Sequence, residues 1–300
     1  MSRSLSAEEL SNAEMYGYLA AAVAPRPICF ASTVDAAGRV NLSPYSFFNV
    51  FSSNPPVMVF SPVRSGRDGS TKNTLDNVLE TREVVINVVN YPMVEQMSLA
   101  STAYEKGVNE FIKAGFTMVA SEEVRAPRVG ESPVSFECKV DQVIPLGEEG
   151  GAGNLVLARV LRVHVKEEML GDDDRLDTQK LDLVARMGSN WYCRASGEAL
   201  FEIPKPTRTI GMGVDALPAH VRESSVLTGN NLGRLGTAER LPTPEEVAGI
   251  RDETEVRQIL ESDLDLKTRT VKLHQLARGY LEVDDQWNAL RALLLEPNPS

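Results

Sequence analysis

The sequence predicts a mostly β protein with helices, followed by a helical C-terminal extension. Short runs rich in Val, Ile and Phe recur between residues 28 and 165. Gly, Pro, Asn and Asp separate these runs, as is typical of strands joined by turns. Toward the C-terminus the apolar residues recur at helical spacing instead. We therefore expect two domains, residues 1–203 and 204–300, with Pro204-Lys205-Pro206 as the linker.

The first expected element is a hairpin. Residues 28–34 are β-prone, residues 35–38 form the turn, and Gly38 can adopt the positive φ that a tight turn requires. The return strand begins at Val40. Pro44 has no N–H to donate, so the strand lies at a sheet edge or is interrupted there.

A polar and aromatic loop is expected to follow, from Ser43 to Asn49. Backbone groups beside an interrupted strand need partners, and a flat heterocycle with donors and acceptors on its rim can supply them. Tyr45, Phe47 and Phe48 could cover the face of such a ligand. The same three rings could equally fill a hydrophobic core, and the residues alone leave both interpretations open.

A short helix after residue 72 is the second part of the candidate site. Leu75, Val78 and Leu79 share one helical face, and Asn73 is a suitable N-cap with Asp76 three residues later. The start of a helix offers free N–H groups and the positive end of the helix dipole.

Positive and hydroxyl side chains surround this helix start. Lys72 adds a charge and Thr74 a hydroxyl, while Arg64 and Arg67 lie just upstream. This combination is a workable phosphate cradle. A plain capped surface helix with a nearby lysine is the alternative interpretation.

The remaining β-branched runs are expected to be strands, at residues 57–61, 84–90, 134–143 and 155–165, and residues 92–114 look helical. Alternation in the last strand places His164 on the polar face, where we expect it to face solvent rather than a ligand. Arg26, between two prolines, either reaches a ligand or lies on the surface.

The C-terminal extension has clear helix signals. Thr243-Pro244-Glu245-Glu246 is a strong helix start, and a helix is expected over residues 254–262. One helical face then carries Leu273, Leu276, Ala277, Tyr280 and Leu281. The extension could pack on the first domain, clasp a second subunit or form a separate binding module.

Composition excludes several classes of function. The net charge of −11 argues against a nucleic-acid partner, and no apolar run is long enough to span a membrane. Cys29, Cys138 and Cys193 are scattered without metal-ligand spacing, and Cys29 and Cys138 are expected to be buried. The cysteine spacing therefore predicts no metal site. The N-terminus lacks the apolar h-region of a secretory signal, so we expect a cytoplasmic protein.

The sequence resembles the flavin reductase-like family of FMN-binding split barrels over roughly residues 15 to 200. The resemblance is carried, in order, by PRPICFASTVD, NLSPYSFFNVFSSNPPVMVFS, STKNTLDNVLET followed by EVVINVVN, and ESPVSFECKV. It implies a split β-barrel that forms a homodimer and binds FMN near the subunit interface. Where the family has Lys-Asp-Thr, this chain has Lys72-Asn73-Thr74.

The resemblance also implies site residues. The stretch from Asn41 to Phe48 would contact the isoalloxazine ring largely through backbone, and the helix start would hold the phosphate. The predicted cofactor-binding residues are Asn41, Ser43, Tyr45, Ser46, Phe47, Phe48, Arg67, Lys72, Asn73 and Thr74. Arg186 and Tyr192 match a family pattern near the cofactor and the dimer seam, as supporting residues.

The implied function is an FMN-binding oxidoreductase, in the first place a flavin reductase that takes hydride from NADH or NADPH at flavin N5. Alternatives are a flavoredoxin-like electron-transfer protein and a flavin-binding interaction protein that uses its helical tail. Since a flavin carries the redox chemistry itself, no catalytic acid or base is assigned.

Overall fold

The computed structural model describes residues 2–203 and 210–295 of the chain. It contains two compact units, Met1–Phe201 and Glu202–Ser300. The expected linker Pro204-Lys205-Pro206 lies outside the described residues, and the domain boundary after residue 203 stays a prediction.

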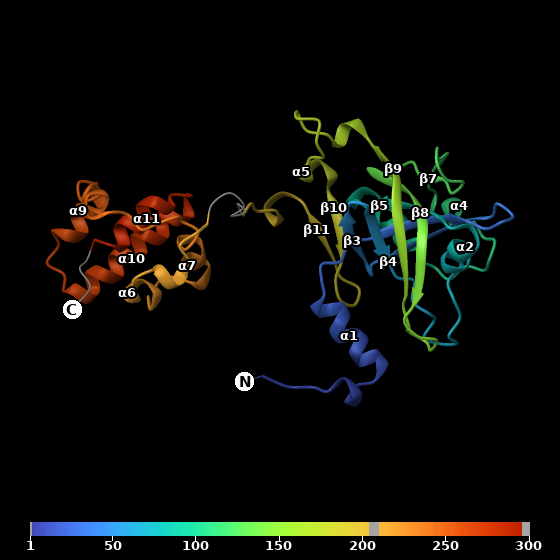
Figure 1. Cartoon of the computed structure of the whole chain (residues 1–300), viewed down its shortest axis with the longest axis horizontal. Helices are drawn as coiled ribbons and strands as arrows, with labels where there is room; N and C mark the ends of the chain where they lie inside the picture. The colour runs from blue at the N-terminus through green and yellow to red at the C-terminus, as the bar shows by residue number, and fades with distance from the viewer. Residues whose placement is uncertain (1, 204–209, 296–300) are drawn as a thin grey trace. The chain divides into compact units, whose positions relative to one another are not determined.

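A seven-stranded antiparallel sheet lies in the first unit (Figure 1). Its strand order is β2-β1-β5-β8-β9-β4-β3. Its strands are β1 Cys29–Val34, β2 Val40–Tyr45, β3 Phe48–Ser53, β4 Pro56–Phe60, β5 Glu83–Val88, β8 Val134–Pro145 and β9 Asn154–Val165. Two small sheets pair β6 Met118–Val119 with β7 Arg128–Val129, and β10 Leu183–Arg186 with β11 Tyr192–Ala195.

The connection between β2 and β3 shows that the sheet is curled. These strands are the two opposite edges of the sheet, yet only Ser46 and Phe47 join them. Six strand spacings of about 4.8 Å would put the edges of a flat sheet roughly 29 Å apart. Three Cα steps of 3.8 Å span about 11 Å at most. The sheet therefore closes on itself into a barrel, and the seam between β2 and β3 has no ladder.

The hairpin was predicted correctly except for its loop. Gly38 has a φ of +81°, and Pro44 lies in an edge strand, as expected. The expectation of a loop from Ser43 to Asn49 was wrong, because Tyr45 still pairs with Cys29 on β1 and Phe48 already pairs with Phe60 on β4.

Five helices accompany the sheet in the described part of this unit: α1 Asn12–Ala22, α2 Asn73–Thr81, α3 Val94–Leu99, α4 Glu110–Ala114 and α5 Thr178–Leu181. The continuous helical character expected for residues 92–114 is wrong, since α3 and α4 are separate. Gly107, with a φ of +95°, lies in the loop between them. Short 3₁₀ helices lie at Ala7–Glu9, Tyr91–Met93, Glu167–Met169 and Gly197–Ala199.

The helix α2 covers one face of the sheet. Leu75 and Val78 are buried against Cys29 and Cys138, both of which are buried as predicted. Leu79 was expected on the same face but is about half exposed. Only Leu75 and Val78 of this helical pattern reach the core.

The second unit is helical and has its own core. Its helices are α6 Ala219–Arg222, α7 Gly229–Leu235, α8 Pro244–Ala248, α9 Thr254–Leu260, α10 Leu266–Glu282 and α11 Gln286–Leu293, with a 3₁₀ helix at Val214–Ala216. Thr243 caps α8 in a capping box with Glu246, as predicted. Leu273, Ala277 and Leu281 of α10 are buried in this core. None of the helices in the described ranges is both long and apolar enough to cross a bilayer.

Candidate functional site

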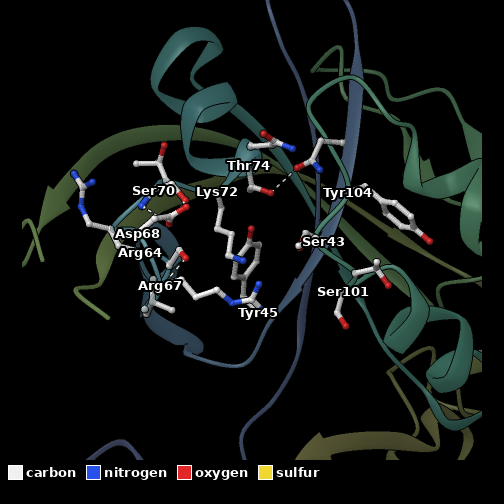
Figure 2. A pocket seen from close by; sticks show the side chains of 18 of the residues that line it. Ser43, Tyr45, Arg64, Arg67, Asp68, Ser70, Lys72, Thr74, Ser101 and Tyr104 are labelled. Carbon is white, nitrogen blue, oxygen red and sulfur yellow. Dashed lines mark hydrogen bonds between the residues drawn. The ribbon is translucent and has the colours of Figure 1, made fainter. Parts of the chain in front are cut away.

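A pocket of about 510 Å³ lies where the edge strand β2 meets the start of α2. Its other walls are the loop from Val63 to Thr71, the stretch Ser101–Tyr104 and Glu110 at the start of α4. Figure 2 shows the side chains that line it. The pocket therefore gathers three segments that are far apart in the sequence.

Seven of the ten predicted cofactor-binding residues line this pocket. They are Asn41, Ser43, Tyr45, Arg67, Lys72, Asn73 and Thr74. The β2 residues and the α2 residues were predicted as two separate halves of one site, and the structure brings them together.

The other three predicted residues lie elsewhere. Ser46 lines a second pocket of about 180 Å³, which adjoins the first because Tyr45 and Ser101 line both. Phe47 and Phe48 line neither of the two pockets. Phe47 packs 6.2 Å from the ring of Tyr16, and Phe48 packs on the barrel core. The chain crosses to β3 at this point, and a place for these two rings beside a ligand stays a prediction.

Unpaired positive charges face the pocket from the loop and the helix start. Arg67 and Lys72 have no side-chain hydrogen bond or ion pair within the described ranges, and both extend into the pocket in Figure 2. Arg64 donates from Nη1 to the Gly69 carbonyl at 3.0 Å, while its buried Nε has no partner in those ranges. These groups form an anion-attracting wall.

One acid lies within this basic loop. Asp68 accepts hydrogen bonds from the hydroxyl of Ser70 at 2.7 Å and from its N–H at 3.1 Å. The hydroxyls of Ser70 and Ser65 hold the pKa of Asp68 down, at about 2. Asp68 therefore stays ionised and fixes the shape of the loop, so the arginines and Lys72 must outweigh one negative charge.

The N-cap of α2 is Lys72, so the expectation that Asn73 caps the helix was wrong. Asn73 is the first helical residue, and the side chain of Lys72 makes no capping bond. The first turn begins with the Leu75 N–H donating to the Lys72 carbonyl at 2.9 Å. The N–H of Asn73 precedes that bond and remains available to an anion.

A chain of hydrogen bonds forms the floor of the pocket. Thr74 Oγ1 donates to Asn41 Oδ1 at 2.6 Å, and Asn41 Nδ2 donates to Glu110 Oε1 at 2.9 Å. The other oxygen of Glu110 accepts the N–H of Leu42, also at 2.9 Å. Burial raises the pKa of Glu110, against the bonds from Leu42 and Asn41 that lower it. Sequence reasoning did not select Glu110, because nothing local connects it with Asn41.

Tyr45 carries an unsatisfied group into the site. Its hydroxyl is buried and has no hydrogen-bond partner in the described part of the chain. Burial raises the pKa of Tyr45 to about 12, although the nearby hydroxyls of Thr74 and Ser43 act to lower it. The hydroxyl therefore remains a protonated donor. Tyr45 lines the pocket, as does Arg64, whose buried Nε likewise has no partner in the described ranges.

Two other residues considered from the sequence have structural roles instead. Arg26 is buried and donates to the carbonyls of Ala20, Val23 and Met187 and to the Ser46 hydroxyl, so it is not a surface residue. His164 does not face solvent. Its Nε2 lies 2.5 Å from Oε1 of the fully buried Glu137.

Arg186 and Tyr192 line the second, smaller pocket. The guanidinium of Arg186 lies 4.6 Å from the centre of the Tyr192 ring, a cation–π distance. The described ranges contain no group of three or more His, Cys, Asp or Glu side chains that could hold a metal ion.

Comparison with known proteins matches the first unit. A model of the flavin reductase like domain matches residues 22–180. A Halalkalibacterium halodurans protein is 38% identical over 205 residues, covering 68% of this chain and 96% of its own length. An Aquifex aeolicus protein is 34% identical over 196 residues, covering 65% and 97%. Both matches leave out about a third of this chain.

Solved structures match the same part. Nitrilotriacetate monooxygenase component B from Bacillus cereus is 29% identical with a TM-score of 0.63, covering 68% of this chain and 99% of its own. The 2-nitrobenzoate 2-nitroreductase of Pseudomonas fluorescens is 25% identical with a TM-score of 0.60, covering 67% and 96%. A Shewanella frigidimarina protein with a split barrel domain is 26% identical with a TM-score of 0.57, covering 68% and 100%.

The barrel with its open seam and the family match over residues 22–180 lead to one conclusion: this chain belongs to the flavin reductase-like family, and its first unit is a split barrel.

Proposed function

We propose that the protein is an FMN-binding flavin reductase that takes hydride from NADH or NADPH. Family membership supports a flavin-related oxidoreductase. The observation that carries the proposal is the pairing of a basic helix start with an edge strand in one pocket of about 510 Å³. One part of that pocket suits a phosphate, and the other suits a ring with polar atoms on its rim.

The proposal gives each wall a role. Lys72, Arg67 and the N–H of Asn73 hold the phosphate, because the described ranges contain no partner for these two side chains or for that N–H. Tyr45 donates its unsatisfied hydroxyl to the ligand. On β2, the side chain of Ser43 lines the pocket beside Tyr45 and offers a hydroxyl to the ring. When bound there, FMN would supply the redox chemistry by accepting hydride at N5.

The smaller adjoining pocket is the place we assign to the second reactant. It shares Tyr45 and Ser101 with the larger pocket, so a molecule in it would lie next to the flavin. Arg186 supplies a positive charge there, and the ring of Tyr192 supplies a flat surface. Both features suit a nicotinamide nucleotide, whose phosphates are anionic and whose bases are planar.

A homodimer is part of the proposal. Tyr16 on α1 and Val50 and Phe51 on β3 expose more than half of their surface. Large apolar side chains exposed on an edge strand are typical of an interface. A cytoplasmic location remains a prediction from the sequence.

The absorption spectrum of the purified protein tests the proposal first. A flavin band, with FMN identified by chromatography after heat release, supports it. A colourless protein is titrated with FMN, and failure to bind contradicts the proposal. NADH and NADPH oxidation with saturating FMN then tests the reductase step. Flavin binding without oxidation of either nucleotide favours the electron-transfer alternative, which a 25% identical flavoredoxin of Desulfovibrio vulgaris also suggests.

The third possibility is a flavin-binding interaction protein that uses its helical tail. The separate core of the second unit favours it as a second candidate, because that core includes no residue of the barrel. A chain that ends after residue 203 distinguishes the two. Retained reductase activity places the chemistry in the barrel, whereas a lost partner interaction with intact activity supports a recognition role for the tail.

A further inference from the structure

We infer that the Thr74 hydroxyl donates its proton to Asn41 and does not bind the flavin phosphate. Glu110 is the positioning residue, because it holds the nitrogen of the Asn41 amide and so turns the amide oxygen toward Thr74. The inference rests on the proposed function, because it concerns the same pocket. It departs from the assignment of Thr74 to the phosphate that the family resemblance implies.

The direction of the hydrogen-bond chain follows from Glu110. The bonds from the Leu42 N–H and from Asn41 favour the ionised form of Glu110 against burial, and an ionised carboxylate only accepts, so Asn41 presents Nδ2 to it, at 2.9 Å. The Leu42 N–H occupies the other carboxylate oxygen, which fixes the position of the acid. The negative charge of Glu110 therefore fixes which end of the Asn41 amide faces it.

The consequence passes to Thr74. With Nδ2 on Glu110, the amide oxygen of Asn41 faces Thr74 Oγ1 at 2.6 Å. An amide oxygen cannot donate, so Thr74 must use its one hydroxyl proton on this bond. Turning that proton toward a phosphate would leave the buried Asn41 oxygen without a partner, which is costly.

Burial leads independently to the same conclusion. Thr74 is 0% exposed, and Asn41 and Glu110 are also buried. Lys72, by contrast, is exposed and has no partner in the described ranges. The groups that meet a phosphate are therefore the side chains of Lys72 and Arg67 with the Asn73 N–H. The Thr74 hydroxyl instead links the start of α2 to β2 through Asn41 (Figure 2).

Riboflavin, which lacks the phosphate, separates the two roles. The ratio of FMN affinity to riboflavin affinity isolates the contribution of the phosphate. Lys72→Ala should lower this ratio about tenfold, the value of one charge-assisted hydrogen bond. Thr74→Val should leave the ratio unchanged within twofold, although both affinities can fall together. A ratio that falls in Thr74→Val as it does in Lys72→Ala overturns the inference.

Glu110→Gln tests the positioning role. A glutamine must give its oxygen to the Leu42 N–H, so its amide N–H groups face Asn41 and reverse that side chain. Asn41 then donates to Thr74, whose proton is released toward the pocket. In this background Thr74→Val should lower the FMN-to-riboflavin ratio, although it is silent in the natural chain. If Thr74→Val leaves the FMN-to-riboflavin ratio unchanged in both backgrounds, Glu110 does not determine where the Thr74 proton points.

Thermal unfolding without flavin keeps the test independent of the proposed function. Thr74→Val should lower the melting temperature by roughly 3 to 8 °C, because the buried Asn41 oxygen loses its donor, while Thr74→Ser should restore most of that loss. Equal stability of the natural chain and Thr74→Val overturns the bond from Thr74 to Asn41. Failure of the natural chain to bind either flavin contradicts the proposed function, and the unfolding result then still tests that bond.

Discussion

The hydroxyl of Tyr45 is the single group whose removal should separate binding from folding. Since this buried hydroxyl has no hydrogen-bond partner among the described residues, Tyr45→Phe should leave the free energy of unfolding within about 1 kcal/mol of the natural value. If the hydroxyl donates to the ligand, FMN affinity should fall roughly 3- to 10-fold. Fluorescence titration and urea unfolding measure the two effects. The half-exposed Tyr18→Phe is the control, and an unchanged FMN affinity in Tyr45→Phe contradicts the assignment.

The basic residues of the pocket could be predicted from the sequence, but the acid that positions Asn41, Glu110, could not. Lys72 and Arg67 are visible in the sequence because positive charges gather at a helix start. Glu110 was missed because a carboxylate at the start of a helix is ordinarily a capping feature, and Asn41 is far from it in the chain. The burial of Arg26 was also beyond local sequence, since its carbonyl partners include Met187.

Among the elements, β3 offers the clearest test of association. It is an edge strand whose Phe51 is 70% exposed. If β3 lies in a dimer interface, Phe51→Asp should weaken the dimer by about 2 kcal/mol or more, a roughly 30-fold change in dissociation constant. Sedimentation equilibrium measures the change. Leu146→Asp, at an exposed turn, is the matched control, and equal behaviour of the two variants excludes β3 from the interface.

Some of the helices and strands could be predicted from the periodicity of the sequence, and others could not. Strand runs and the 243–246 helix start were predictable because both depend on local sequence. The stretch Ser43–Asn49 was not, because pairing with β1 and β4 overrides its loop-like composition. The closure of the barrel was visible only through the family resemblance, since it depends on which strands are neighbours.

For the whole molecule, the two separate cores predict independent folding. The buried cluster of the second unit runs from Leu217 to Leu295 and contains no barrel residue. A chain that ends after residue 203 should therefore fold and bind FMN with an affinity within about threefold of the full chain. Circular dichroism and FMN titration measure this. Aggregation of the shorter chain, or loss of FMN binding, would show that the barrel depends on the tail.

The second unit should also lose stability in acid. His274 is buried, with Nδ1 2.6 Å from Ser224 Oγ, and burial followed by the charge of His220 lowers the pKa of His274 to about 4. Its ordinary value is 6.5, so below that the unfolded chain binds the proton more tightly. Stability is full above pH 6.5 and falls by about 3 kcal/mol as the pH decreases to 4.

Tryptophan fluorescence can follow this unit alone. The chain has two tryptophans, and Trp191→Phe leaves Trp287 of α11 as the reporter. Urea midpoints at pH 7 and pH 4.5 then measure the effect, and His274→Asn should flatten the dependence because Asn can still accept from Ser224. An equally steep loss in that variant assigns the acid sensitivity to other groups.

The order of the strands has a consequence for synthesis of the chain. Within the sheet, β4 pairs only with β3 and β9, and β9 begins at Asn154, long after β4 ends at Phe60. At roughly 5 to 20 residues per second, the ribosome needs about 5 to 20 s to make the stretch between them. Throughout that interval the nascent β3–β4 hairpin has a bare edge, so chaperone supply and translation speed should govern the yield of folded protein more than its final stability does.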